Sequence, residues 1–182
     1  MNTFVALIRG INVGGHNKLP MANLRAALSE AGFQNVKTYI QSGNVIFDSH
    51  LNDENLLEKT ISEVLSSVFS LDVPVIVKSA NAIKAILDHC PFAPEMKENS
   101  YFILLSKTPD KVLVNDVSSI AYEGEQFQII RDCLYFYSSH GYGRTKFNMK
   151  TFEKRLRVTG TSRNYKTMLK LLSMAAETQA EL

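Results

Sequence analysis

The first 79 residues alternate between strand-like and helix-like patterns in an order that few folds accommodate. Short apolar or alternating runs mark strands, and apolar residues spaced by three and four mark helices. The patterns predict a strand over 3–8, a helix over 20–31, strands over 36–40 and 45–47, a helix over 52–71 and a strand over 74–79. This β-α-β-β-α-β order is that of the ferredoxin-like, or α/β-plait, fold. We therefore expect a ferredoxin-like domain over residues 1–79.

Residues 80–182 predict a second α+β domain that is less regular than the first. After a short helix over 81–89 and a proline-containing loop, the patterns favour a strand over 101–107, a helix over 110–120, a hairpin over 125–139 and helices over 147–158 and 161–177. No low-complexity linker separates the two halves. The expected fold class is therefore α+β, with two α/β-plait domains and extra basic C-terminal helices in the second.

Composition excludes several classes of protein. The chain has 182 residues, which is enough to bury a large core without disulfides or structural metals. Its two cysteines, Cys90 and Cys133, form no CxxC motif, its four histidines are scattered, and no apolar run approaches the roughly 20 residues of a membrane span. The N-terminus lacks the basic region of a signal peptide. We expect a cytoplasmic protein without metal, cofactor or membrane contact.

Charge is concentrated in one C-terminal segment. Residues 144–170 hold nine basic residues and one acid, Glu153, for a net charge of +8, although the whole chain carries only +2. The predicted helix in this segment buries Met149, Phe152 and Leu156. Such a surface attracts polyanions such as nucleic acids, although a solvated charged face would explain it without a ligand. The candidate polyanion contacts are Lys146, Lys150, Lys154, Arg155 and Arg157.

A glycine-rich loop follows the first predicted strand, whose end is marked by Arg9. Glycines in such a loop allow positive φ and let main-chain N–H groups approach a ligand closely. A loop of this kind before a helix is a candidate anion cradle, although it lacks the Gly-Lys-Ser/Thr ending of a P-loop. The alternative is that the glycines only shape the loop and that Arg9 pairs with a carboxylate. The candidate ligand contacts are Arg9, Gly10, Asn12, Gly14 and Gly15.

Two further segments offer polar contacts. Ser42 and Asn44 flank Gly43 in a predicted hairpin turn, where they either stabilise the turn or face a ligand beside Arg9. In the last predicted helix, Thr161 or Ser162 is the expected cap, which places Arg163 and Asn164 in the first turn. A basic residue there opposes the helix dipole, so this placement favours a bound anion or a carboxylate from elsewhere in the chain.

Three separated motifs resemble the bacterial domain-of-unknown-function (DUF) 1697 family. They are ALIRGINVGGHNKLPM over 6–21, TYIQSGNVIF over 38–47 and GTSRNYKTMLKL over 160–171. The family pattern has leucine where this chain has Ile8. The resemblance implies two α/β-plait domains and supplies no catalytic residue, because the family's activity is not established.

Three functional hypotheses follow. The leading one is a binder of a phosphate-bearing ligand, a nucleic acid or nucleotide, that uses Arg9, its glycine loop and Arg163 together with the basic segment. The second is an enzyme that acts on a small anionic substrate in an interdomain cleft, with Ser42, Asn44, His16 and Tyr39 as candidate residues. The third is a structural or interaction protein without a ligand. Stacking of RNA bases on the sheet is disfavoured, because the third strand offers only Phe47.

Overall fold

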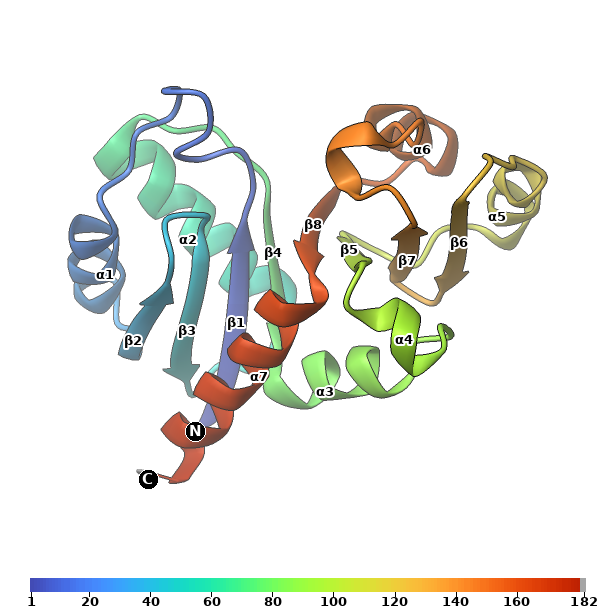
Figure 1. Ribbon diagram of the computed structural model, residues 1–182. Coiled ribbons are helices and arrows are strands. Elements are labelled where there is room, and N and C mark those ends of the chain that lie inside the picture. Colours follow the sequence, from blue (N-terminus) through green and yellow to red (C-terminus); the bar gives the residue numbers. More distant parts are fainter. Residues whose placement is uncertain (181–182) are drawn as a thin grey trace. The chain divides into compact units, whose positions relative to one another are not determined.

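The computed structural model describes residues 1–180 and contains two compact units (Figure 1). The first unit comprises Met1–Ala85 together with the C-terminal residues from Lys170 on, and the second comprises Ile86–Leu169. Each unit contains a four-stranded antiparallel sheet, and seven α-helices occur in the described part of the chain. The protein is therefore an α+β protein, as the sequence predicted.

The first unit contains all six stretches that the sequence predicted for residues 1–79. They are β1 (Asn2–Ile8), α1 (Met21–Glu30), β2 (Gln34–Tyr39), β3 (Asn44–Ser49), α2 (Glu54–Phe69) and β4 (Val75–Ser79). The strand order is β2-β3-β1-β4, and every neighbouring pair is antiparallel. The hairpin between β2 and β3 lies where the sequence QSGN predicted it.

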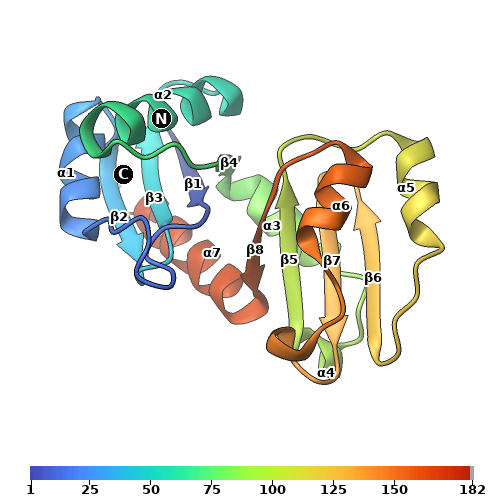
Figure 2. The same ribbon diagram turned by 90° about the horizontal axis from the view of Figure 1, so that it is seen from above.

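Helices α1 and α2 cover one face of this sheet (Figures 1 and 2). Alternation along the strands directs Phe4 and Phe47 towards these helices, and their rings stack with centroids 5.8 Å apart. The opposite face is also apolar, and Val5, Leu7 and Ile46 on it are fully buried. Both faces of the sheet are therefore covered.

The remaining elements of residues 1–180 are α3 (Ala80–Asp88), α4 (Pro94–Lys97), β5 (Ser100–Leu105), α5 (Lys111–Ser118), β6 (Glu125–Ile130), β7 (Cys133–Ser138), a 3-10 turn (Tyr142–Arg144), α6 (Met149–Leu156), β8 (Gly160–Asn164) and α7 (Tyr165–Ala180). The second unit contains its own sheet with the strand order β6-β7-β5-β8, again antiparallel throughout. Its core lies between this sheet and α6, where the rings of Phe136 and Phe147 stack with centroids 4.5 Å apart.

The prediction for residues 161–164 is wrong, because these residues belong to β8 and not to a helix. Thr161 pairs with Leu104 of β5, and Arg163 pairs with Phe102. Helix α7 begins only at Tyr165, and its cap is Asn164, whose Oδ1 accepts the N–H of Thr167 at 2.8 Å. The second unit therefore repeats the β-α-β-β-α-β order and the strand order of the first, with α4 before β5, the 3-10 turn before α6 and α7 after β8 as additions.

The helices of residues 1–180 lack membrane-spanning character. None of them combines the length and the apolar composition that crossing a bilayer demands.

Candidate functional site

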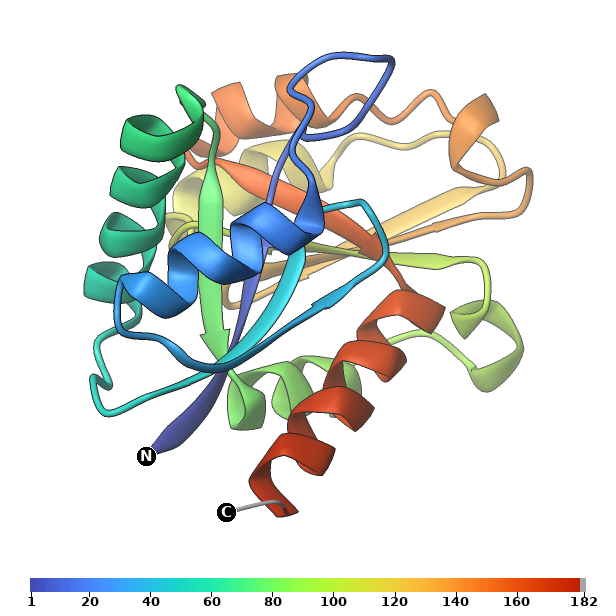
Figure 3. The same cartoon turned by 90° about the vertical axis from the view of Figure 1, so that its left-hand side faces the viewer.

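The loop after β1 has the backbone conformation that its glycines predicted. Gly10, Gly14 and Gly15 have φ angles of +70°, +57° and +79°, all in the left-handed region. All three are exposed, and the loop projects beyond the end of the sheet (Figure 3). A residue with a Cβ would be strained at these positions, which explains the glycines.

Asn12 fixes the base of this loop. Its Nδ2 donates to the carbonyl oxygens of Leu19 and Gln41, both at 2.9 Å, and its Oδ1 accepts the N–H of Leu19 at 2.8 Å. A second asparagine, Asn17, donates from Nδ2 to the Gly10 carbonyl at 2.9 Å. The Asn12 carboxamide therefore ties the loop to the β2–β3 turn, and its established contacts are structural.

Asn44 has a similar structural part in the β2–β3 turn. It is fully buried, and its Nδ2 donates to Ser42 Oγ at 2.9 Å and to the Tyr39 carbonyl at 3.1 Å. Between Ser42 and Asn44, the carbonyl oxygen of Gly43 accepts a hydrogen bond from the N–H of Ile8 at 2.8 Å. The turn thus lies directly beside the end of β1, as the sequence-based hypothesis required, and the Asn44 side chain is buried within it.

Arg9 follows β1 directly and is half-buried, while Gly14 and Gly15 are exposed at the loop tip. The main-chain N–H of Arg9 donates to the Pro74 carbonyl at 2.9 Å, so the backbone at this point is held on both sides. The structure thus brings Arg9, Asn12, Ser42 and Asn44 to the same end of the first sheet. Their binding of a ligand stays a prediction.

Arg163 lies on β8 in the second unit and is half-buried. One guanidinium nitrogen donates to Thr161 Oγ1 at 2.9 Å and to the Ser162 carbonyl at 2.8 Å. Burial lowers the pKa of Arg163 to about 10, so the group stays charged at neutral pH. Asn164 uses its side chain to cap α7. Since Arg9 and Arg163 belong to different units, a pocket shared by them also stays a prediction.

Helix α6 exposes the basic residues that the sequence assigned to its outer face. Asn148 caps the helix, since its Oδ1 accepts the N–H of Thr151 at 3.2 Å. Phe152 and Leu156 are buried in the core. We call the exposed outer row, which consists of Lys146, Lys150, Lys154 and Arg157, the cationic stripe.

The cationic stripe is not neutralised by the chain itself. Within residues 1–180, none of its four side chains has a hydrogen bond or an ion pair. The neighbouring Arg155, which the sequence also predicted as a polyanion contact, forms an ion pair with Asp116 at 3.5 Å, and both side chains are exposed. Glu153, the acid of this segment, accepts the N–H of Gly160 at 2.8 Å. The stripe therefore presents unbalanced positive charge to solvent.

The loop before α6 is positioned by Glu125 of β6, a contact that the sequence did not predict. Glu125 Oε1 accepts from Thr145 Oγ1 and from the N–H of Lys146, both at 2.8 Å. The loop also contains Gly141, with φ of +78°, and the exposed Arg144. The glycines of GYGRTK were a usable signal, because they precede basic residues and a helix as in the loop after Arg9.

Several aromatic residues of the two sheets are buried. Phe4, Phe47, Phe102 and Tyr135 are at most 2% exposed, whereas Tyr39, Tyr101, Phe127 and Tyr137 are half-buried. RNA-binding plaits stack bases on exposed aromatic rings of the sheet. Contact of a nucleic acid with the helices and loops stays a prediction.

The described residues show neither a metal-binding cluster nor an activated thiol. No group of three or more His, Cys, Asp or Glu side chains among them could hold a metal ion. Burial raises the pKa of both Cys90 and Cys133, which keeps these thiols protonated and poorly nucleophilic. Ser139 Oγ donates to the Gly124 carbonyl at 3.0 Å. Its hydroxyl is thus engaged in holding a turn.

These features define a two-unit α+β protein with an exposed cationic helix. The chain belongs to the DUF1697 family, described as "Protein of unknown function (DUF1697)", whose family model matches residues 1–135, and the resemblance seen in the sequence is confirmed. Among solved structures it is similar to the conserved bacterial protein SP0830 from Streptococcus pneumoniae, with 24% identity and a TM-score of 0.77 over 96% of this chain and 98% of that one. This similarity shows the fold alone. No curated protein matches the chain.

Proposed function

We propose that the protein binds a phosphate-bearing ligand, a nucleic acid or a nucleotide, through the cationic stripe. The observation that carries the proposal is that four exposed cations of one short segment have no internal partner within residues 1–180. Lys150 and Lys154 are four residues apart, so they lie on the same face of α6, and Arg157 follows as its C-cap residue. Like charges at this spacing repel and destabilise a helix. A bound polyanion would remove that repulsion.

The neighbouring loop supports the same proposal. Arg144 is exposed and the N–H of Lys146 is fixed by Glu125. Lys154 and Arg155 lie in the last turn of α6, where positive charge is favourable, but Lys150 lies in the first turn, where it opposes the helix dipole. Helix stability alone therefore does not account for Lys150. Arg9 with its glycine loop and Arg163 are proposed as additional contacts.

We also infer that each unit is a ferredoxin-like α/β plait and that the protein acts in the cytoplasm. The plait assignment is supported by the β-α-β-β-α-β order and by a central pair formed by the first and third strands of each sheet. The two buried free thiols favour a reducing compartment. The division of the chain into domains 1–79 and 80–182 stays part of the proposal.

The test is the salt dependence of binding to a short, fluorescently labelled single-stranded oligonucleotide. Removal of two charges by Lys150→Gln with Lys154→Gln should weaken binding for every sequence. It should also lower the slope of log K against log salt by roughly 0.7 for each phosphate that the protein no longer neutralises. Fluorescence anisotropy between about 50 and 200 mM salt measures both quantities.

The matched control is Lys107→Gln with Lys111→Gln, which removes the same charge from exposed lysines of the same unit. The proposal requires this control to keep the wild-type slope. An equal weakening in both double variants would indicate general electrostatic attraction and would contradict a site on α6. The absence of any binding at low salt would end the nucleic-acid form of the proposal.

A further inference from the structure

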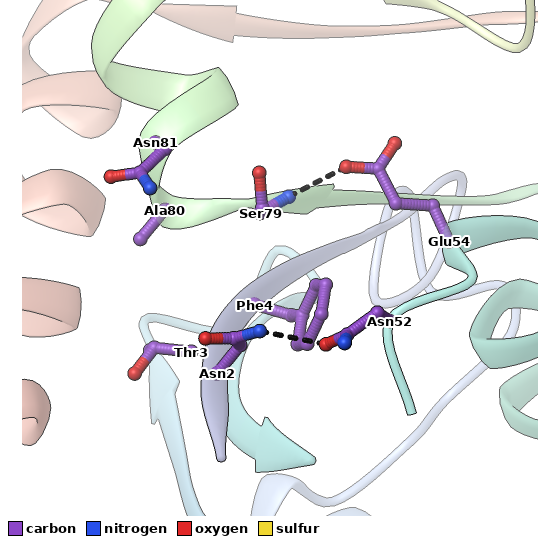
Figure 4. Close-up of a pocket in the computed structure, with 8 residues that line it drawn as sticks. All are labelled: Asn2, Thr3, Phe4, Asn52, Glu54, Ser79, Ala80 and Asn81. Carbon is purple, nitrogen blue, oxygen red and sulfur yellow. Dashed lines mark hydrogen bonds between the residues drawn. The ribbon is translucent and has the colours of Figure 1, made fainter. Parts of the chain in front are cut away.

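A pocket of about 290 Å³ lies in the first unit, at the end of β1 opposite to the Arg9 loop. Three separate parts of the chain form it: the start of β1, the start of α2 and the junction of β4 with α3 (Figure 4). The lining residues are Asn2, Thr3, Phe4, Asn52, Glu54, Ser79, Ala80 and Asn81. Because all of them belong to the first unit, the pocket is a property of that unit alone.

Internal hydrogen bonds fix the walls of the pocket. Asn2 Nδ2 donates to Asn52 Oδ1 at 2.7 Å, and the N–H of Ser79 donates to Glu54 Oε1 at 2.8 Å (Figure 4). The other oxygen of Glu54 forms an ion pair with Lys78 at 3.2 Å. Glu54 is therefore committed to the wall and largely neutralised, and the pocket is formed before any ligand arrives.

Several polar atoms of the wall remain available. Asn2 Oδ1, Asn52 Nδ2 and both polar atoms of the Asn81 carboxamide have no hydrogen-bond partner within residues 1–180. All three asparagines are exposed. The carboxamides of Asn2 and Asn52 lie side by side, joined by their hydrogen bond, and Asn81 lines the pocket from the start of α3.

The chemistry of the pocket selects its ligand. A carboxamide presents one donor and one acceptor in a plane, and this geometry pairs with the adjacent donor and acceptor on the edge of a base, as asparagine does with adenine. The volume of this pocket lies just below the range of about 300–1,000 Å³ that is usual for small-molecule sites, and it suits a compound of one or two rings. No lysine or arginine is among the lining residues described, so a phosphate would find only the Glu54 carboxylate there.

We propose that this pocket binds a nucleobase or a nucleoside, a neutral ligand, through the carboxamides of Asn2, Asn52 and Asn81. The inference does not depend on the proposed function of the cationic stripe, which lies in the other unit. Adenosine is the first probe, because its base offers a donor next to an acceptor. AMP carries the same base with a phosphate and should bind more weakly than adenosine.

The experiment is isothermal titration of the full chain with adenosine, guanosine, cytidine, uridine, AMP and glucose. Asn81→Ala should weaken nucleoside binding about tenfold, because it removes a bidentate contact. The substitution should leave the melting temperature unchanged, since the Asn81 side chain is exposed and makes no hydrogen bond within residues 1–180. Asn23→Ala removes an exposed asparagine of α1 outside the pocket and should bind like the wild type.

Four results would overturn the proposal: no nucleoside binds, glucose binds more tightly than every nucleoside, Asn81→Ala binds as the wild type does, or AMP binds more tightly than adenosine to the variant Lys150→Gln with Lys154→Gln, in which the cationic stripe is weakened. The double variant Lys150→Gln with Lys154→Gln separates the two sites. It should bind adenosine normally, and a loss of adenosine binding in this variant would place the nucleoside on the second unit and contradict the pocket.

Discussion

At the scale of single residues, Gly43 allows two segments to meet at the end of the first sheet. A Cβ at this position would lie 2.6 Å from the Ile8 carbonyl oxygen and 3.0 Å from the Ile11 side chain. The φ angle is +75°, which also favours glycine. The sequence predicted a turn glycine here, but the close approach to β1 becomes visible only when the strands are paired.

We expect Gly43→Ala to destabilise the fold much more than Gly15→Ala. Both positions have positive φ, which costs an alanine about 1–2 kcal/mol. Gly15 has open space around its Cβ position, whereas at Gly43 the clash with backbone adds a further 1–3 kcal/mol or so. Urea unfolding of the two variants measures the difference. Equal losses of stability would mean that the backbone of Ile8 yields easily and that close packing at Gly43 is unimportant.

At the scale of elements, α2 protects the exposed edge of the first sheet. Strand β4 is an edge strand, and its outward N–H groups at Val77 and Ser79 need acceptors. Glu58 Oε1 accepts the first at 2.9 Å and Glu54 Oε1 accepts the second at 2.8 Å. The rise along α2 from Glu54 to Glu58 is about 6 Å, and the rise along β4 from Val77 to Ser79 is similar. The two carboxylates are therefore spaced like the two N–H groups.

This arrangement predicts a pH effect at Glu58. Burial raises the pKa of this carboxyl above its ordinary value of 4.5, despite the hydrogen bond from Val77 and the charge of Lys78. A raised folded-state pKa contributes stability that is complete below the unfolded pKa and is lost as pH rises through the folded pKa. Glu58→Gln keeps the acceptor and removes the charge. The variant should therefore gain stability relative to the wild type as pH rises from below 4.5 towards neutrality.

Thermal unfolding of both proteins across this pH range measures the effect. Glu63→Gln is the control, since Glu63 lies on the same helix with its side chain 65% exposed and paired with Lys59. It should show no comparable trend. The proposal of a desolvated carboxylate at Glu58 would be contradicted if the stability gained by Glu58→Gln over the wild type did not change with pH, or if it fell as pH rose.

Elements were predictable where periodicity was long enough to define them. On α6, the buried Phe152 and Leu156 and the exposed Lys150 and Lys154 follow from helical spacing. Strand β8 was not predictable, because its five residues GTSRN alternate in no clear way and contain residues that also suit a helix start. Pairing with β5 makes them a strand, and the true cap of α7 lies at Asn164.

At the scale of the whole molecule, the two candidate sites differ in whether folding must bring distant segments of the chain together. The sequence predicted the cationic stripe, because its residues are close together along the chain, on α6 or directly beside it. The sequence did not predict the pocket lined by Asn2, Asn52 and Asn81. These residues are far apart in the sequence, and only the pairing of the strands brings them together. The sequence predicted two similar α+β halves from the order of their elements, but the matching strand order of the two sheets is set by pairing and leaves no repeat in the sequence.

The return of the chain to its first unit gives the last prediction. Residues from Lys170 on belong to the unit that begins at Met1, and Leu171 among them is fully buried. Leu171→Ala should therefore cost about 2–5 kcal/mol, as a cavity in a packed core does. Leu169, two positions earlier on α7, is 43% exposed, so Leu169→Ala should cost far less. Chemical unfolding of both variants compares them directly. If the two losses of stability were equal, Leu171 would not be part of a packed core, and the C-terminal half of α7 would contribute little to the first unit.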